Sequence, residues 1–63
     1  MTIQQQIESV KRELAMRRRV YPRWTEAGKM KPTTAQYEIE CMEAVLATLE
    51  SLNRTPKQEG LFA

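Results

Sequence analysis

The side chains best suited to chemistry in this sequence lie together between Arg17 and Trp24. The segment RRRVYPRW contains four arginines, the only tryptophan and one of the two tyrosines. Arginine presents a planar set of N–H donors that can hold a phosphate or carboxylate through two bonds. Aromatic rings provide surfaces on which bases stack. The segment therefore has the residue types that binding of a phosphate-bearing nucleotide requires.

The expected ligand-binding residues come from this segment and from the loop that follows it. They are Arg17, Arg18, Tyr21, Arg23, Trp24, Lys29 and Lys31. Two carboxylates of the second half, Glu38 and Glu43, are expected to orient the arginines. The resulting hypothesis is a protein that binds and sequesters a nucleotide signal.

The same residue types support two other hypotheses. Trp, Tyr and Arg dominate protein–protein hot spots, so Met16, Val20, Trp24 and the arginines would equally suit an inhibitor of another protein. Nucleic-acid binding comes third, because the net charge is only +2 and the second half of the chain is acidic. All three hypotheses describe binding to a partner.

Catalysis and metal binding find little support in the composition. The chain has no histidine and one cysteine, Cys41, so a Cys/His zinc site cannot form. Its two glycines, Gly28 and Gly60, do not make a phosphate-binding loop. We therefore expect a protein that is not an enzyme and uses no cofactor or metal.

The small size of the chain points to self-association. A domain of 63 residues buries little apolar surface, and one cysteine cannot form an intrachain disulfide. Oligomerisation is the remaining way to stabilise it. The single cysteine suits a reducing compartment, and no apolar run approaches the roughly 20 residues of a membrane span. We expect a cytoplasmic protein that does not enter a membrane.

The apolar spacing in the first half predicts a helix over about 2–27. Thr2 is the expected N-cap, and Gly28 is expected in the left-handed position after the helix. Pro22 should kink or interrupt the helix near residues 18–22. The narrow apolar seam consists of Ile3, Ile7, Val10, Leu14 and Tyr21.

A loop over 28–33 and a second helix over about 34–53 are predicted next, followed by a flexible tail over 54–63. Thr33 is the expected cap, with Gln36 at capping-box spacing. The apolar stripe of this helix is broad: Ala35, Ile39, Met42, Val45, Leu46, Leu49 and Leu52, extended by Cys41. A broad stripe indicates more than one packing neighbour. The prediction is an all-α antiparallel hairpin that forms a dimeric four-helix bundle.

Charge also divides the chain into two halves. Residues 11–31 are mainly basic, whereas residues 34–53 contain four glutamates and no cation. The halves are therefore expected to lie against each other, although a basic surface intended for a partner remains the alternative. Glu38 falls in the middle of the apolar arc, where a carboxylate is costly unless paired. We expect it to pair with Arg17, Arg18 or Arg23.

Several short segments together resemble a known group of proteins. They are RRRVYPRW, Gly28-Lys29-Met30, Ala35, Glu38-Ile39 and Met42-Glu43-Ala44. Over residues 10–50 the chain is similar to very short, mostly uncharacterised helical proteins encoded by tailed bacteriophages and prophages. The resemblance implies a phage accessory protein in the cytoplasm of a bacterial host. Such a setting favours a counter-defence role, with a nucleotide signal or a host protein as the target.

Overall fold

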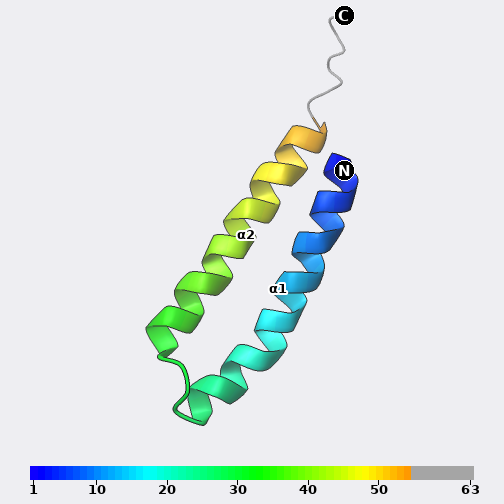
Figure 1. Cartoon of the computed structure of the whole chain (residues 1–63). Helices are drawn as coiled ribbons and strands as arrows, with labels where there is room; N and C mark the ends of the chain where they lie inside the picture. Colours follow the sequence, from blue (N-terminus) through cyan, green and yellow to red (C-terminus); the bar gives the residue numbers. More distant parts are fainter. Residues whose placement is uncertain (55–63) are drawn as a thin grey trace, which may run out of the picture.

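The computed structural model describes residues 1–54 and contains two helices in this range. Helix α1 spans Ile3–Glu26 and helix α2 spans Pro32–Arg54. They lie side by side and antiparallel, with the start of α1 next to the end of α2 (Figure 1). The all-helical hairpin is thus confirmed. Arg54 belongs to α2, and the rest of the predicted tail lies outside the described residues.

The start of α1 follows from its capping residues. The Thr2 hydroxyl accepts a hydrogen bond from the Gln5 N–H at 3.1 Å, and the Gln5 side chain accepts one from the Thr2 N–H at 2.9 Å. This reciprocal pair is a capping box, which satisfies two backbone donors that have no partner within the helix. The predicted N-cap is confirmed.

The end of α1 follows from Gly28. Its φ of +77° is strained for other residues, and the chain turns there. The Gly28 N–H bonds the Thr25 carbonyl, and the Lys29 N–H bonds the Trp24 carbonyl at 2.8 Å. This is the Schellman arrangement, and it satisfies carbonyls that the helix leaves open.

Pro22 does not interrupt α1, contrary to the prediction of a possible pause. The helix is continuous through it. Figure 1 shows α1 curving towards the loop over its last turns, as expected where a proline removes a backbone donor. The continuous helix keeps Tyr21 in the seam begun by Ile7 and Leu14.

The predicted cap of the second helix is wrong. Helix α2 begins at Pro32, and the Ala35 N–H bonds the Lys31 carbonyl at 2.9 Å. Proline suits the first helical position, because its fixed φ is helical and its missing N–H would have no partner there. Thr33 therefore lies inside the first turn. The side chain of Gln36 bonds Glu40, so it closes no capping box.

The core between the helices is small. Ile7, Leu14 and Tyr21 of α1 repeat every seven residues and are 3 to 8% exposed, and Ala35 is the buried residue of α2. The seven-residue spacing keeps these side chains on one line facing the neighbouring helix. The other apolar residues of the two expected stripes are half-buried or exposed. The hairpin alone covers only part of its apolar surface.

Candidate functional site

Arg17 connects the two helices at the centre of the predicted site. Its Nε donates to Glu13 Oε2 at 2.8 Å, and its Nη1 donates to the Glu38 backbone carbonyl at 2.9 Å. The same Nη1 lies 3.4 Å from Glu38 Oε1. The Arg17 side chain is 17% exposed, so the network is partly shielded from water. The expected pairing of Glu38 with an arginine is confirmed.

The position of Glu38 differs from the expectation in one respect. Its side chain is 42% exposed, so it lies at the edge of the helix contact and not in the middle of a buried arc. A carboxylate at the edge keeps part of its hydration, and the cost of burial is correspondingly small. Because the hydrogen bond donated to Glu13 favours the charged form, the pKa of the Arg17 guanidinium is raised above its ordinary value. The charges of Tyr21, Glu13 and Glu38 act in the same direction, and desolvation opposes them.

Arg18 forms the second bridge between the helices, on the opposite side of the hairpin. Its Nη2 lies 2.6 Å from Glu43 Oε2, with both side chains about half exposed. Glu38 and Glu43, the predicted orienting carboxylates, therefore form ion pairs with Arg17 and Arg18. The consequence is unfavourable for anion binding, because a phosphate would have to compete with these carboxylates for Arg17 and Arg18.

The aromatic residues of the segment form a stack. The rings of Tyr21 and Trp24 are 5.7 Å apart between centroids and inclined by 29°. The Arg17 guanidinium carbon lies 5.8 Å from the Tyr21 ring centroid, within the range of a cation–π contact. Tyr21 is buried, whereas Trp24 is 43% exposed. Of this stack, Trp24 offers the larger surface to a partner.

The remaining predicted cations stand apart from this network. Arg23, Lys29 and Lys31 are exposed, and their side chains form no ion pair or hydrogen bond within residues 1–54. On α1, Arg12 and Arg19 have the same property and were not among the predicted site residues. The spacing of positions 12, 19 and 23 places them on one face of a helix and could have identified them.

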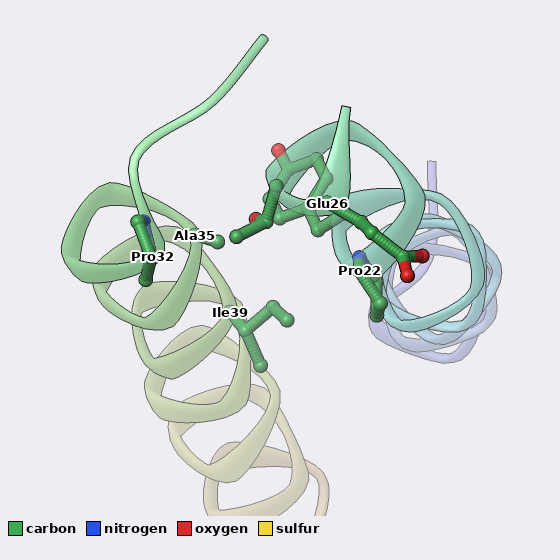
Figure 2. Close-up of a pocket in the computed structure, with 7 residues that line it drawn as sticks. Pro22, Glu26, Pro32, Ala35 and Ile39 are labelled. Atoms are coloured by element: carbon green, nitrogen blue, oxygen red, sulfur yellow. The ribbon is translucent and has the colours of Figure 1, made fainter. Parts of the chain in front are cut away.

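A hollow lies at the loop end, between the two helices. It has a volume of about 430 Å³, and Pro22, Pro32 and Ile39 form much of its wall (Figure 2). Its other lining residues are Tyr21, Thr25, Glu26 and Ala35. None of the predicted cations lines it, and its one charged group is a carboxylate. The hollow therefore does not form a phosphate-binding pocket together with the arginines.

One side of the hairpin is apolar, and its members follow from the Arg17–Glu38 contact. Residues seven apart on a helix point in nearly the same direction. We call this the apolar side: Ile3, Val10, Arg17 and Trp24 on α1, with Glu38, Val45 and Leu52 on α2. Val45 is 40% and Leu52 56% exposed. A hollow of about 260 Å³ lined by Ala44, Val45, Thr48 and Leu49 lies on this part of α2.

The opposite side of the hairpin is polar. By the same spacing, the Arg18–Glu43 contact groups Gln4, Lys11 and Arg18 of α1 with Gln36, Glu43 and Glu50 of α2. Gln4 accepts a hydrogen bond from Asn53 of α2 at 3.3 Å there. The two sides of the hairpin therefore differ. The polar side is suited to contact with water, and the apolar side is suited to contact with an apolar partner.

Cys41 and Tyr37 lie near the apolar side on α2. The hydrogen bond between their side chains, together with the charges of Cys41 and Glu38, raises the pKa of the Tyr37 phenol above its ordinary value. Tyr37 is 64% exposed and Cys41 is half-buried. Among residues 1–54, no group of His, Cys, Asp and Glu is placed to hold a metal ion. Neither described helix has the length and apolarity needed to cross a membrane.

Comparisons with protein-family models, curated proteins and solved structures found no match to this chain.

Proposed function

We propose that this protein is a non-catalytic module that acts by protein–protein contact, and that its first partner is a second copy of itself. Two hairpins would join their apolar sides into a four-helix bundle. The observation that carries this proposal is the exposure of Trp24, Val45 and Leu52 on one side of the hairpin. Large apolar groups gathered on one side are typical of an interaction surface.

The size of the core supports self-association. The described chain has four buried apolar residues, and no side chain is completely buried. A core of this size contributes little stabilisation against the entropy of ordering two long helices. Covering Val45, Leu52 and Trp24 would add apolar burial at about 25 cal/mol per Å². In the dimer, the second copy would pack against the part of the broad α2 stripe that is exposed within residues 1–54.

The Arg17 network would lie within such an interface. Arg17 uses Nε and Nη1 for Glu13 and Glu38, and its Nη2 forms no hydrogen bond or ion pair within the described residues. A free guanidinium donor can bond a group of the second copy. Polar groups within an apolar interface can fix the register and orientation of the two copies, because in any other register these groups would be left without hydrogen-bond partners. We assign this role to Arg17 and Glu38.

The RRRVYPRW resemblance supplies a biological setting for the module. In that setting the dimer would be a phage accessory protein in the bacterial cytoplasm that contacts a host protein, consistent with a counter-defence role. Such a role requires only that the dimer bind its target stoichiometrically, and binding needs no catalytic group. The resemblance is the only support for this part of the proposal.

A second candidate function is supported by the unpaired cations at the loop end. Arg23, Lys29 and Lys31 have no carboxylate partner within residues 1–54, and exposed Trp24 is adjacent to Arg23. They could hold the phosphates of a nucleotide while Trp24 stacks on its base. Calorimetric titration with cyclic and linear nucleotides tests this candidate. Binding that is lost in Arg23→Ala and Lys29→Ala would favour it over protein contact.

Light scattering tests the main proposal. We expect a dimer with twice the 7.4 kDa mass of the chain. Val45→Lys should abolish the dimer, because it places a charge at the centre of the apolar side. Ala47→Lys is the matched control, since Ala47 is an exposed residue of α2 outside that side. A folded wild-type monomer, or equal effects of the two substitutions, would overturn the proposal.

A further inference from the structure

The charges of the two helices restrict how two copies can pair. Two hairpins that meet face to face can be related by a two-fold axis along the helices or across them. An axis along the helices places α1 on α2 of the second copy, with both loops at one end. An axis across them places α1 on α1 and α2 on α2, with the loops at opposite ends.

Helices α1 and α2 have opposite net charges. Between Ile3 and Glu26 there are six Lys and Arg against three Glu, which gives +3. Between Pro32 and Arg54 there are four Glu against one Arg, which gives −3. Packed helices lie about 8–10 Å apart, which is comparable to the Debye length of about 8 Å at physiological ionic strength. Charges on facing helices therefore still act on each other.

We infer that the dimer pairs α1 with α2 of the second copy and places both loops at one end. In this arrangement each α1, with a net charge of +3, faces an α2 with a net charge of −3. In the alternative, α1 faces α1 and α2 faces α2, so helices of like charge face each other. The position of Arg17 near the middle of α1 also disfavours the arrangement with the axis across the helices. An axis across the helices would bring it to within about a turn and a half of Arg17 of the second copy on the facing α1. The inference rests on the proposed homodimer and specifies its geometry.

The apolar residues match in the same arrangement. The contacts of Gln4 with Asn53 and of Arg17 with Glu38 define which residues are level along the hairpin. Ile3 is then nearly level with Leu52, and Val10 lies between the levels of Val45 and Leu49. With loops together, each copy places Ile3 and Val10 over the exposed Leu52 and Val45 of the other. The apolar hollow beside Val45 would accept a side chain from the opposing α1.

The arrangement also brings the unpaired loop cations of both copies to one end. Lys29 and Lys31 are exposed, and the described chain has no partner for them. Their mutual repulsion is weaker than helix-on-helix attraction because exposed groups at the end are screened by water and salt. A multivalent anion would reduce it further.

A distance measurement between labelled loops tests the inference. Cys41→Ser removes the native thiol, and Lys29→Cys introduces a spin label in the loop. With loops together, the two labels should lie within about 30 Å of each other. With loops apart they should be separated by about 40 Å or more, given the 1.5 Å rise per residue of these helices.

Light scattering on the same labelled sample separates the possible failures. A dimer with the short distance supports the arrangement. A dimer with the long distance overturns it and leaves the proposed homodimer intact. A monomer overturns the homodimer itself. Labelling at Ser9→Cys is the control, because this exposed residue lies nearer the middle of α1 and its label distance should differ much less between the two arrangements than that of Lys29.

Discussion

Arg17 is bonded to both the backbone carbonyl and the carboxylate of Glu38, which lies twenty-one residues further along the chain. The bond to the carbonyl is the shorter, at 2.9 Å against 3.4 Å. The carbonyl cannot be titrated or removed by substitution of Glu38. The connection between the helices is therefore expected to depend more on Arg17 than on the Glu38 carboxylate.

Arg17→Met should lower the free energy of unfolding by about 1.5–3 kcal/mol, as for hydrogen bonds that involve a charged group. Met keeps most of the aliphatic volume and removes the donors. Glu38→Gln should cost less than about 1 kcal/mol, because its carboxylate is partly exposed and the carbonyl bond remains. Urea unfolding at a fixed protein concentration measures both. Arg19→Met is the control, and equal losses for Arg17→Met and Arg19→Met would contradict the prediction.

The Arg18–Glu43 pair should contribute little despite its short distance. Both side chains are about half exposed, and such pairs are worth about 0–1 kcal/mol and are screened by salt. A double-mutant cycle with Arg18→Ala and Glu43→Ala should give a coupling that disappears in high salt. A coupling that persists in high salt would show that the pair is shielded by a partner.

Gly28→Ala should destabilise the hairpin by about 1 kcal/mol. The φ of +77° places a side chain at Gly28 in the left-handed region, which costs roughly 1–2 kcal/mol for most residues. No atom lies within 4 Å of the position a Cβ would take, so the cost comes from the backbone alone. Gly28→Asn should cost less, because Asn tolerates this conformation. Equal unfolding midpoints for the two variants would be evidence against this explanation.

The two predicted caps provide a matched comparison. Thr2→Ala should cost about 1 kcal/mol, because the hydroxyl accepts the Gln5 N–H. Thr33→Ala should change stability by less than about 0.5 kcal/mol, since Thr33 lies inside the first turn of α2 and caps nothing. Thermal unfolding of the two variants is sufficient to compare them. A larger loss for Thr33→Ala would place the start of α2 at Thr33 after all.

Tyr37 should titrate above the ordinary tyrosine pKa of about 10. The hydrogen bond with Cys41 raises the pKa of the Tyr37 phenol in the folded state. A raised pKa means that the folded state holds the proton more tightly. The associated stability is therefore present below pH 10 and is lost as the pH rises through the folded-state pKa. NMR titration of the Tyr37 ring should show the pKa falling towards 10 in Cys41→Ala, and an unchanged pKa would exclude the contact.

Much of the hairpin was predictable because its determinants are local. The seven-residue repeat of Ile7, Leu14 and Tyr21, the Thr2 hydroxyl and the left-handed Gly28 act within one or two turns of the chain. Their spacing alone predicted α1 and its two ends. The opposite charges of the two halves predicted that arginines and glutamates would meet across the hairpin.

Other features depended on how the helices pack. Threonine is favoured as an N-cap and proline as the first helical residue. Local sequence preferences therefore did not determine whether α2 begins at Pro32 or after Thr33. Periodicity placed Glu38 in an apolar arc, but in the packed hairpin it lies at the edge of the helix contact, beside Arg17. Packing also determined which cations are engaged: Arg17 and Arg18 reach the carboxylates of α2, whereas Arg23 does not. Sequence spacing specifies the direction of a side chain about its own helix, and only the tertiary structure determines what it meets there.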